Sequence, residues 1–298
     1  MIKATGKYSL SKDGGNTWLK QKNMILAGYY TLTHRPAVSL AVGTSSDPVQ
    51  FDQTFISNKI VSTPSSSVFD DGKSYKINPD NYVIRRTKRF DFGLGNSLEL
   101  GEMGLFSSGK LASRSITKDA QGSAVVVSVG STDSLTILYE ITYKIPREPR
   151  RISIDFKGQE VGGTMYFANP NKWGSNYFSE VVNITNVGVG KGIALDSEGF
   201  VSQGLTEKSI DVDADRISVD GVLTDSFGIF AGIEDLNGSI EQFVFCSGSV
   251  SKNNIVILID LDAPIEKTND DSLSLSVLLS QEPTFNDSNT TEHDNGNT

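Results

Sequence analysis

Apolar and polar residues alternate along several segments of this chain. The pattern is clearest between residues 135 and 145, where every second position is apolar: Leu135, Ile137, Tyr139, Ile141, Tyr143 and Ile145. Successive side chains of a β-strand point to opposite faces, so this spacing predicts a strand that buries one face in a core. The same period recurs at residues 152–156, 255–261 and 273–279, which predicts three further strands.

Short turn signals separate these strand-like segments. They include Asp71-Gly72, Ser107-Ser108-Gly109, Gly190-Lys191 and Asn237-Gly238, and no long stretch carries the apolar stripe of a helix. We therefore expect an all-β fold in which antiparallel strands form sandwiches or barrels.

A break in the alternation divides the chain near its middle. Pro146 and Pro149 fix the backbone and remove hydrogen-bond donors between two predicted strands. We predict two tandem antiparallel β-sandwich domains, the first at residues 1–147 and the second at residues 148–284. From residue 286 onward the chain has no aliphatic or aromatic residue, so we predict that residues 285–298 form a disordered acidic tail.

The two halves share short motifs in the same order. Glu102, Phe106 and Gly109 match Glu241, Phe245 and Gly248 at an offset of 139, and residues 133–137 match residues 271–275 at an offset of 138. Weaker matches join Val42-Gly43 with Val187-Gly188, and Trp18 with Trp173. Because collinear similarity indicates a repeat, an internal duplication of one sandwich is a hypothesis for the second domain.

Composition and charge restrict the classes of partner. The formal net charge is -9, so the mean field repels a nucleic-acid backbone, and nucleic acid is an unlikely partner. No run approaches the roughly 20 apolar residues of a membrane span, and residues 1–6 do not begin a signal peptide. We expect synthesis in a cytoplasm and no membrane span. Cys246 lies in an apolar run, where it is expected to be a small buried hydrophobe.

One strand of the first half ends in an unusual turn. Residues 40–54 run from Leu40-Ala41-Val42 through Gly43-Thr44-Ser45 to Asp47-Pro48 and then Asp52 and Thr54. Downstream come Glu102-Met103-Gly104-Leu105-Phe106, Leu111-Ala112-Ser113-Arg114, and the alternating strand that reaches Glu140. Over about residues 16–145, these features resemble a class of bacteriophage tail and virion proteins, in which a strand ending Val-Gly-Thr-Gly precedes a proline turn and an Asp-Thr pair.

The resemblance implies a structural role in a virion. It implies a tail, collar or fibre-attachment component in the tail or neck region, made in the host bacterial cytoplasm, whose partners are other virion proteins and copies of itself. That class carries no catalytic residues, so none are assigned to this chain. Ser45 departs from the pattern, because it stands where the class has a second glycine, and serine tolerates positive φ less readily than glycine.

Catalytic and metal sites find little support in the sequence. The only histidines are His34 and His293, which are not arranged for a triad or a zinc site. Asp211, Asp213 and Asp215 have the spacing that opens a calcium loop, but the glycine and glutamate that complete such a loop are missing, so a solvated strand or turn is preferred. We predict no enzyme activity, no cofactor and no metal.

Asp260 and Asp262 share one face of a predicted strand. Paired carboxylates of this kind can act as acids, but they also protect an exposed sheet edge from unwanted strand addition. We prefer the second interpretation.

Two segments are candidates for partner contacts. Arg85, Arg86, Lys88 and Arg89 form the one concentrated basic run, and a protein contact or a solvated face is preferred there over nucleic acid.

The second candidate is a loop-like segment with aromatic residues and amides. It contains Trp173, Tyr177 and Phe178, which suit either a subunit contact or a host-surface glycan. The alternatives to an assembly component therefore remain a receptor- or glycan-binding module of a tail fibre or tip, and a head decoration protein.

Overall fold

The computed structural model describes most of the chain. The described residues are 2–26, 38–50, 52–64, 72–107, 109–170, 184–211, 213–219, 222–232, 234–247 and 249–283. The predicted tail at residues 285–298 lies outside them. The described residues contain no helix that is long and apolar enough to cross a membrane.

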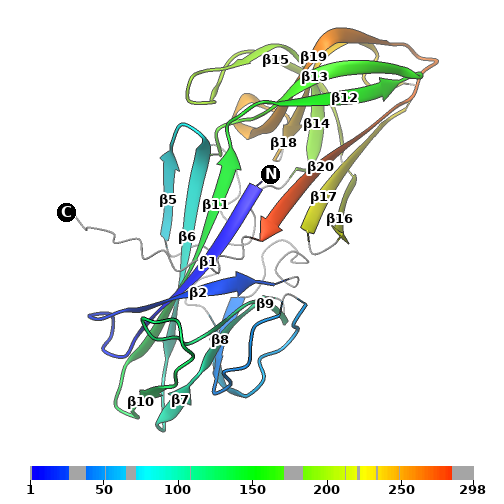
Figure 1. Ribbon diagram of the computed structural model, residues 1–298. Helices are drawn as coiled ribbons and strands as arrows, with labels where there is room; N and C mark the ends of the chain where they lie inside the picture. Colours follow the sequence, from blue (N-terminus) through cyan, green and yellow to red (C-terminus); the bar gives the residue numbers. More distant parts are fainter. Residues whose placement is uncertain are drawn as a thin grey trace.

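The protein is all-β, as the alternation predicted (Figure 1). A large curled sheet of twelve strands contains β1 Ile2–Ser11, β2 Leu19–Ile25, β3 Val38–Gly43, β4 Lys59–Pro64, β5 Gly72–Ile77, β6 Asn81–Phe92, β8 Glu102–Ser107, β9 Lys110–Ile116, β11 Leu135–Pro146, β16 Asp213–Val219, β17 Val222–Ala231 and β20 Leu273–Pro283. A six-stranded antiparallel sheet contains β12 Arg150–Phe156, β13 Gln159–Phe167, β14 Asn186–Leu195, β15 Val201–Asp211, β18 Gly238–Cys246 and β19 Ile255–Lys267. The small strands β7 Leu98–Leu100 and β10 Val127–Val129 pair with each other, and η2 Lys252–Asn254 is one turn of 3-10 helix.

Strand β1 is the centre of the large sheet. One edge of β1 pairs with β11 from Lys3 to Ser11. The other edge pairs with β20 at Ile2–Ala4 and with β2 at Gly6–Leu10. A strand has two edges, so β2 and β20 divide one edge of β1 between them. This arrangement joins strands from both ends of the chain.

The large sheet curls over an apolar core. From β1, one arm runs through β11 and β6 to β5, and the other runs through β2, β9, β8 and β3 to β4. The arms approach each other again where Thr63 Oγ1 on β4 donates to the carbonyl of Asp91 on β6 at 3.3 Å. The six predicted inward residues of β11 are all at most 1% exposed, which confirms their face.

The six-stranded sheet follows the order β12-β13-β19-β18-β14-β15. Three of the predicted apolar residues of β19, Ile255, Ile257 and Ile259, are buried there, but Val256 and Leu258 between them are buried as well. Val256, Ile257 and Ile259 belong to the main core, because a register shift against β18 interrupts the alternation next to Ile255. Ile255 and Leu258 pack in a second small cluster with Ala168 and Val244 on the other face of the sheet. For this part of β19, the expectation of one buried face was too simple, because side chains pack on both faces of the sheet.

The cross-strand pair Tyr8 and Tyr139 lies at the junction of β1 and β11. The ring centroids are 5.0 Å apart, both residues are fully buried, and the Tyr8 hydroxyl donates to the Ser113 carbonyl at 3.3 Å. Burial raises the pKa of Tyr139 to about 12, and burial together with the neighbouring Tyr139 raises the pKa of Tyr8 well above its usual value.

We expect alkaline unfolding that involves this pair. The folded state holds both hydroxyls protonated, whereas the unfolded chain releases these protons near pH 10, so stability is present below pH 10 and is lost as pH rises toward 12. The double variant Tyr8→Phe, Tyr139→Phe should therefore unfold at higher pH than the same chain carrying Tyr166→Phe. Circular dichroism during an alkaline titration measures both midpoints, and equal midpoints would contradict the assignment.

Candidate functional site

The predicted basic run is divided by the alternation of β6. Arg85 and Arg89 have side chains that are 51% and 47% exposed, whereas Arg86 and Lys88 are 2% and 0% exposed. Arg86 and Lys88 stand opposite Ile141 and Tyr139 of β11, so they share the interior face of the sheet. The run is therefore not one surface patch, although it reads as one in the sequence.

The exposed members of the run already face carboxylates of this chain. Arg85 Nε lies 3.5 Å from Glu140 Oε1, and Arg89 Nε lies 3.0 Å from Asp91 Oδ2. The Arg89 guanidinium lowers the pKa of Asp91 through this hydrogen bond. A partner contact through Arg85 and Arg89 stays a prediction, while Arg86 and Lys88 are enclosed by the sheet.

The aromatic candidates and both histidines cannot be placed. Trp173, Tyr177, Phe178, His34 and His293 all lie outside the described residues. The hypothesis of a subunit or glycan contact through the three aromatic residues therefore stays a prediction.

The other candidates for metal binding or reactivity are an aspartate triplet and Cys246, and both lie in strands. Among the described residues, no group of three or more His, Cys, Asp or Glu residues could hold a metal ion. Asp211 ends β15, and Asp213 and Asp215 lie in β16, so the triplet spans two strands rather than one calcium loop. Cys246 is fully buried as predicted, and burial raises the pKa of its thiol to about 11.

The interpretation of Asp260 and Asp262 as protectors of a sheet edge is wrong. Their strand β19 pairs with β13 on one side and with β18 on the other, so it is not an edge strand. Asp262 instead accepts a hydrogen bond from Arg151 Nη1 at 2.9 Å, in a two-point contact that crosses β13. This contact lowers the pKa of Asp262, and the missing side chain of Gly162 leaves room for it.

A buried ion pair is the most developed polar site in the described structure. Arg114 Nε on β9 donates to Glu102 Oε2 on β8 at 2.8 Å, and both side chains are 0% exposed. Burying two charges is favourable only when further hydrogen bonds satisfy them. The chain between β3 and β4 supplies these bonds on both sides of the pair.

Glu102 and Arg114 each hold the backbone of this connection. Glu102 Oε1 accepts from the Asn58 amide at 2.9 Å, and Oε2 accepts from the Ser57 amide at 3.3 Å. Arg114 Nη1 donates to the carbonyl of Asp47 at 2.9 Å and to that of Pro48 at 3.3 Å. The ion pair therefore fixes both ends of residues 47–58 against the sheet.

Gly43 and Ser45 fit the same arrangement. A Cβ on Gly43 would lie 2.7 Å from Glu102 Oε1, so a larger residue would displace the carboxylate. Ser45 has no positive φ, and its hydroxyl donates to Asp47 Oδ2 at 2.7 Å and accepts from the Asp47 amide. The turn therefore accepts serine at the position where the sequence pattern suggested glycine.

We call Glu102, Arg114 and residues 43–58 the buried clamp. Its apolar side consists of Ile56 and Val49, which pack with Leu111 and Ala41 on the outer face of the sheet. Phe55 projects from the clamp and is 62% exposed. The sequence motifs include both Glu102 and Arg114, but they do not indicate that the two residues form a pair. The one sequence feature that indicates a buried charge is an arginine among small and apolar residues of a strand.

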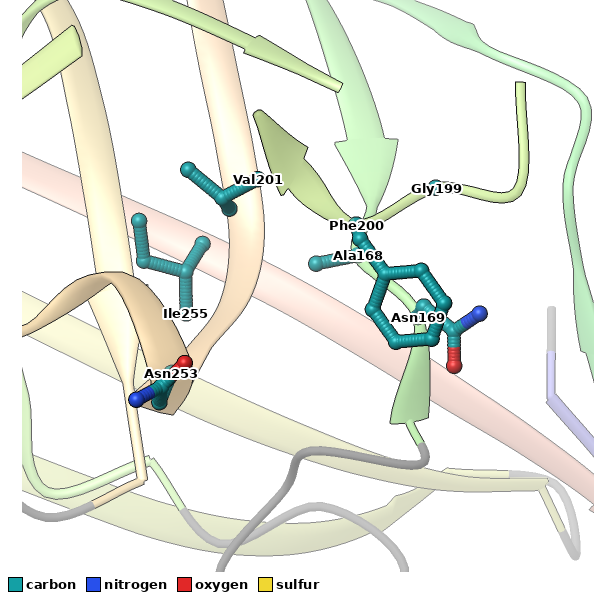
Figure 2. Close-up of a pocket in the computed structure, with 7 residues that line it drawn as sticks. All are labelled: Ala168, Asn169, Gly199, Phe200, Val201, Asn253 and Ile255. Carbon is teal, nitrogen blue, oxygen red and sulfur yellow. The ribbon is translucent and has the colours of Figure 1, made fainter. Parts of the chain in front are cut away.

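Two hollows lie where the six-stranded sheet meets its connections. The smaller has a volume of about 130 Å³ and is lined by Ala168, Asn169, Gly199, Phe200, Val201, Asn253 and Ile255 (Figure 2). This volume is below the range of about 300–1,000 Å³ that is usual for small-molecule pockets. Asn169 is also committed to the fold, because its side-chain amide donates to the Glu198 carbonyl at 2.8 Å.

The larger hollow is a groove of about 810 Å³ between the two sheets. It is lined by residues 79–82, residues 146–149, Tyr166, Phe167, Leu195, Asp196 and Gly199. Arg147 closes part of it, because its guanidinium lies 5.4 Å from the centre of the Tyr82 ring and donates to the Ser197 carbonyl at 2.6 Å. Aromatic, acidic and amide groups line the remaining surface.

The chain matches no protein-family model, no curated protein and no solved structure.

Breaking the buried clamp should lower the free energy of unfolding. Arg114→Met leaves the Glu102 carboxylate buried without its cation, and we expect a loss of about 3–5 kcal/mol in the free energy of unfolding. Arg89→Met removes an exposed ion pair and should cost about 0–1 kcal/mol. Urea unfolding followed by tryptophan fluorescence measures both, and similar small losses would show that the clamp does not stabilise the fold.

Gly199 should tolerate no side chain. It has a φ of +83°, and a Cβ there would collide with the hydroxyl of Tyr82 across the groove. Gly192 has a φ of +61° but open space at the Cβ position, so Gly192→Ala is a control that carries only the backbone strain. We expect Gly199→Ala to lose about 1–3 kcal/mol more than Gly192→Ala in urea unfolding. Equal losses would mean that Tyr82 moves aside freely.

Proposed function

We propose that this chain is a non-enzymatic structural protein of a bacteriophage virion, which acts at the tail, collar or fibre attachment through symmetric protein–protein contacts. The main support for the proposal is the structural role of the motif that resembles virion proteins. Its glutamate and arginine are enclosed and hold the backbone at both ends of residues 47–58, and its glycine leaves room for the glutamate carboxylate. Such a motif supports a rigid scaffold rather than a reaction centre.

We also infer that the two predicted tandem sandwiches are copies of one unit of nine strands. In chain order, strands β1, β2, β3, β4, β5, β6, β8, β9 and β11 correspond to β12, β13, β14, β15, β16, β17, β18, β19 and β20. The first set makes eight antiparallel ladders. Seven of these recur between the corresponding strands of the second set. Strands β7 and β10, which pair only with each other, have no counterpart.

The turns that begin β11 and β20 support the duplication. Asp133 Oδ2 accepts from the Gly130 amide at 2.8 Å, and the Asp133 amide donates back to the Gly130 carbonyl at 3.1 Å. Asp271 Oδ2 accepts from the Thr268 amide at 2.9 Å, and the Asp271 amide donates back to Thr268 at 3.2 Å. Both turns lie at the offset of 138 that the sequence motifs share.

The buried polar position also recurs, with a small correction to the sequence matches. Gly43 pairs with Glu102, and Gly190 pairs with Gln242, whose side chain bonds both the amide and the carbonyl of Ile193. The counterpart of Val42-Gly43 is therefore Val189-Gly190 rather than Val187-Gly188. The match of Glu102 with Glu241 is displaced by one residue, because a register shift precedes Gln242.

Corresponding strands lie at sheet edges in both halves. Strands β4 and β5, and their counterparts β15 and β16, each have one ladder partner within the described residues. An unpaired strand edge is a template for another chain, so a duplicated unit offers repeated surfaces for assembly. Contacts that are modest singly become strong when several act together.

The groove of about 810 Å³ favours a second candidate function. Tyr166, Asp80, Asn81 and Asp196 present the aromatic and hydrogen-bonding groups that suit a sugar. A receptor- or glycan-binding module of a tail fibre or tip therefore remains the alternative, and binding by the purified chain on a glycan array would favour it.

We expect the purified chain to self-associate as its concentration rises and to leave capsular polysaccharide and DNA unaffected. Sedimentation velocity should reveal discrete oligomers, because closed symmetry limits growth. Turnover of a polysaccharide would contradict a structural role, and salt-sensitive DNA binding below micromolar concentration would contradict the partner assignment.

A further inference from the structure

The one ladder that does not recur between the halves leaves a strand edge open. In the first half, β1 pairs with β2 on one edge and with β11 on the other. Its counterpart β12 pairs with β13, but β12 and β20 form no ladder in the described structure. Strand β20 approaches β12 beside the ion pair of Lys157 Nζ with Asp271 Oδ1 at 2.6 Å, then runs toward β1 (Figure 1).

The hairpin of β12 and β13 decides which backbone groups face the open edge. Its two-residue turn, Lys157-Gly158, has positive φ at both positions, and Phe156 pairs with Gln159 across it. In such a hairpin, the pair that flanks the turn is hydrogen bonded, and the bonded pairs recur at every second residue. The amides and carbonyls of Arg151, Ser153 and Asp155 therefore point away from β13.

Strand β12 is complementary to itself when a second copy is reversed. With Ser153 opposite Ser153 of the copy, Arg151 stands opposite Asp155 and Ile152 stands opposite Ile154. The outward-facing residues 151, 153 and 155 then form the hydrogen-bonded pairs, so their backbone groups satisfy one another. Opposite charges and β-branched residues are both favourable in cross-strand pairs.

The faces of β12 agree with this register. Arg151, Ser153 and Asp155 are exposed, whereas Ile152 is half-buried and Ile154 is buried. A two-fold axis perpendicular to the sheet keeps each face on its own side, so the apolar residues of both copies meet on the inner face. Arginine on an edge can also repel other chains, but here each arginine has an aspartate in the facing position.

We propose that β12 is a self-association surface, at which two copies of this chain join their six-stranded sheets through an antiparallel β12–β12 pair. This inference rests on the proposed function, since it specifies one of the symmetric contacts through which the chain assembles. The guanidinium of Arg151 contacts Asp262 across β13 on the outer face of the sheet, so it pairs with Asp155 of the copy by turning toward the open edge of β12.

Disulfide trapping tests the register. In a Cys246→Ala background, Ser153→Cys should form disulfide-linked dimers under mild oxidation, because facing residues of a hydrogen-bonded pair have Cα atoms about 5.5 Å apart, within disulfide reach. Ser123→Cys, exposed in the turn between β9 and β10, is the control and should remain mostly monomeric. Equal trapping of both variants would indicate random collision and overturn the register.

Charge exchange tests the facing pairs without oxidation. Arg151→Asp and Asp155→Arg each place like charges opposite each other, so each variant alone should self-associate about tenfold more weakly at this surface. An equimolar mixture should form mixed dimers, because both facing pairs are then of opposite charge. Native mass spectrometry counts the mixed species, and thermal melting checks that each variant is folded. Failure of the mixture to form dimers would overturn the proposal.

Measurements on the wild-type chain distinguish a failure of the β12 surface from a failure of the proposed function. If it forms oligomers that neither trapping nor charge exchange affects, the β12 surface is wrong and the proposed function stands. If it remains monomeric up to its solubility limit, both the β12 surface and self-association as the mode of assembly are wrong.

Discussion

The division of one edge of β1 between β2 and β20 is the constraint on which the rest of the architecture depends. Strand β11 occupies the other edge along nearly the whole of β1, so the remaining edge must serve both neighbours. Residues 2–4 hold the last strand of the chain, and residues 6–10 begin the arm that ends at β4. The folding of the first strand is therefore inseparable from the placement of the last.

Polar and charged side chains are buried near this junction. Tyr8 and Tyr139 place two hydroxyls in the core, and the buried clamp places two charges in the same sheet, two and three strands away from β1. Burying such groups is favourable only when their partners are held in position. The clamp satisfies this condition with backbone amides and carbonyls at the two ends of the connection between β3 and β4, which it holds against the sheet. The same connection carries the exposed side chain of Phe55 on the surface.

Sequence reasoning was reliable where one physical rule acted alone. Period-two alternation predicted β11, β12, β19 and β20, since a strand that buries one face must alternate. The same rule, applied to the basic run, would have separated Arg85 and Arg89 from Arg86 and Lys88, but local charge density suggested a single patch. Which strands are edges could not be predicted, because that depends on partners far away in the chain, and Asp260 and Asp262 were misinterpreted for this reason. The pairing of Glu102 with Arg114 needed the register of β8 against β9, which the local pattern does not contain.

The difference between the halves follows from the same competition for edges. In the first half, β11 pairs with β1 along nearly the whole of that strand. In the second half, β20, the proposed counterpart of β11, bonds at its end to β1, and among the described residues β12 has no ladder in its place. If the two units arose from one sequence, that original unit closed its own sheet. Joining the units then exchanged a contact within one unit for a contact between units, and the edge left behind carries the charges that another copy can match. Strand β20 therefore joins the two halves through β1, and it also leaves free the edge of β12 that we propose for pairing with another copy.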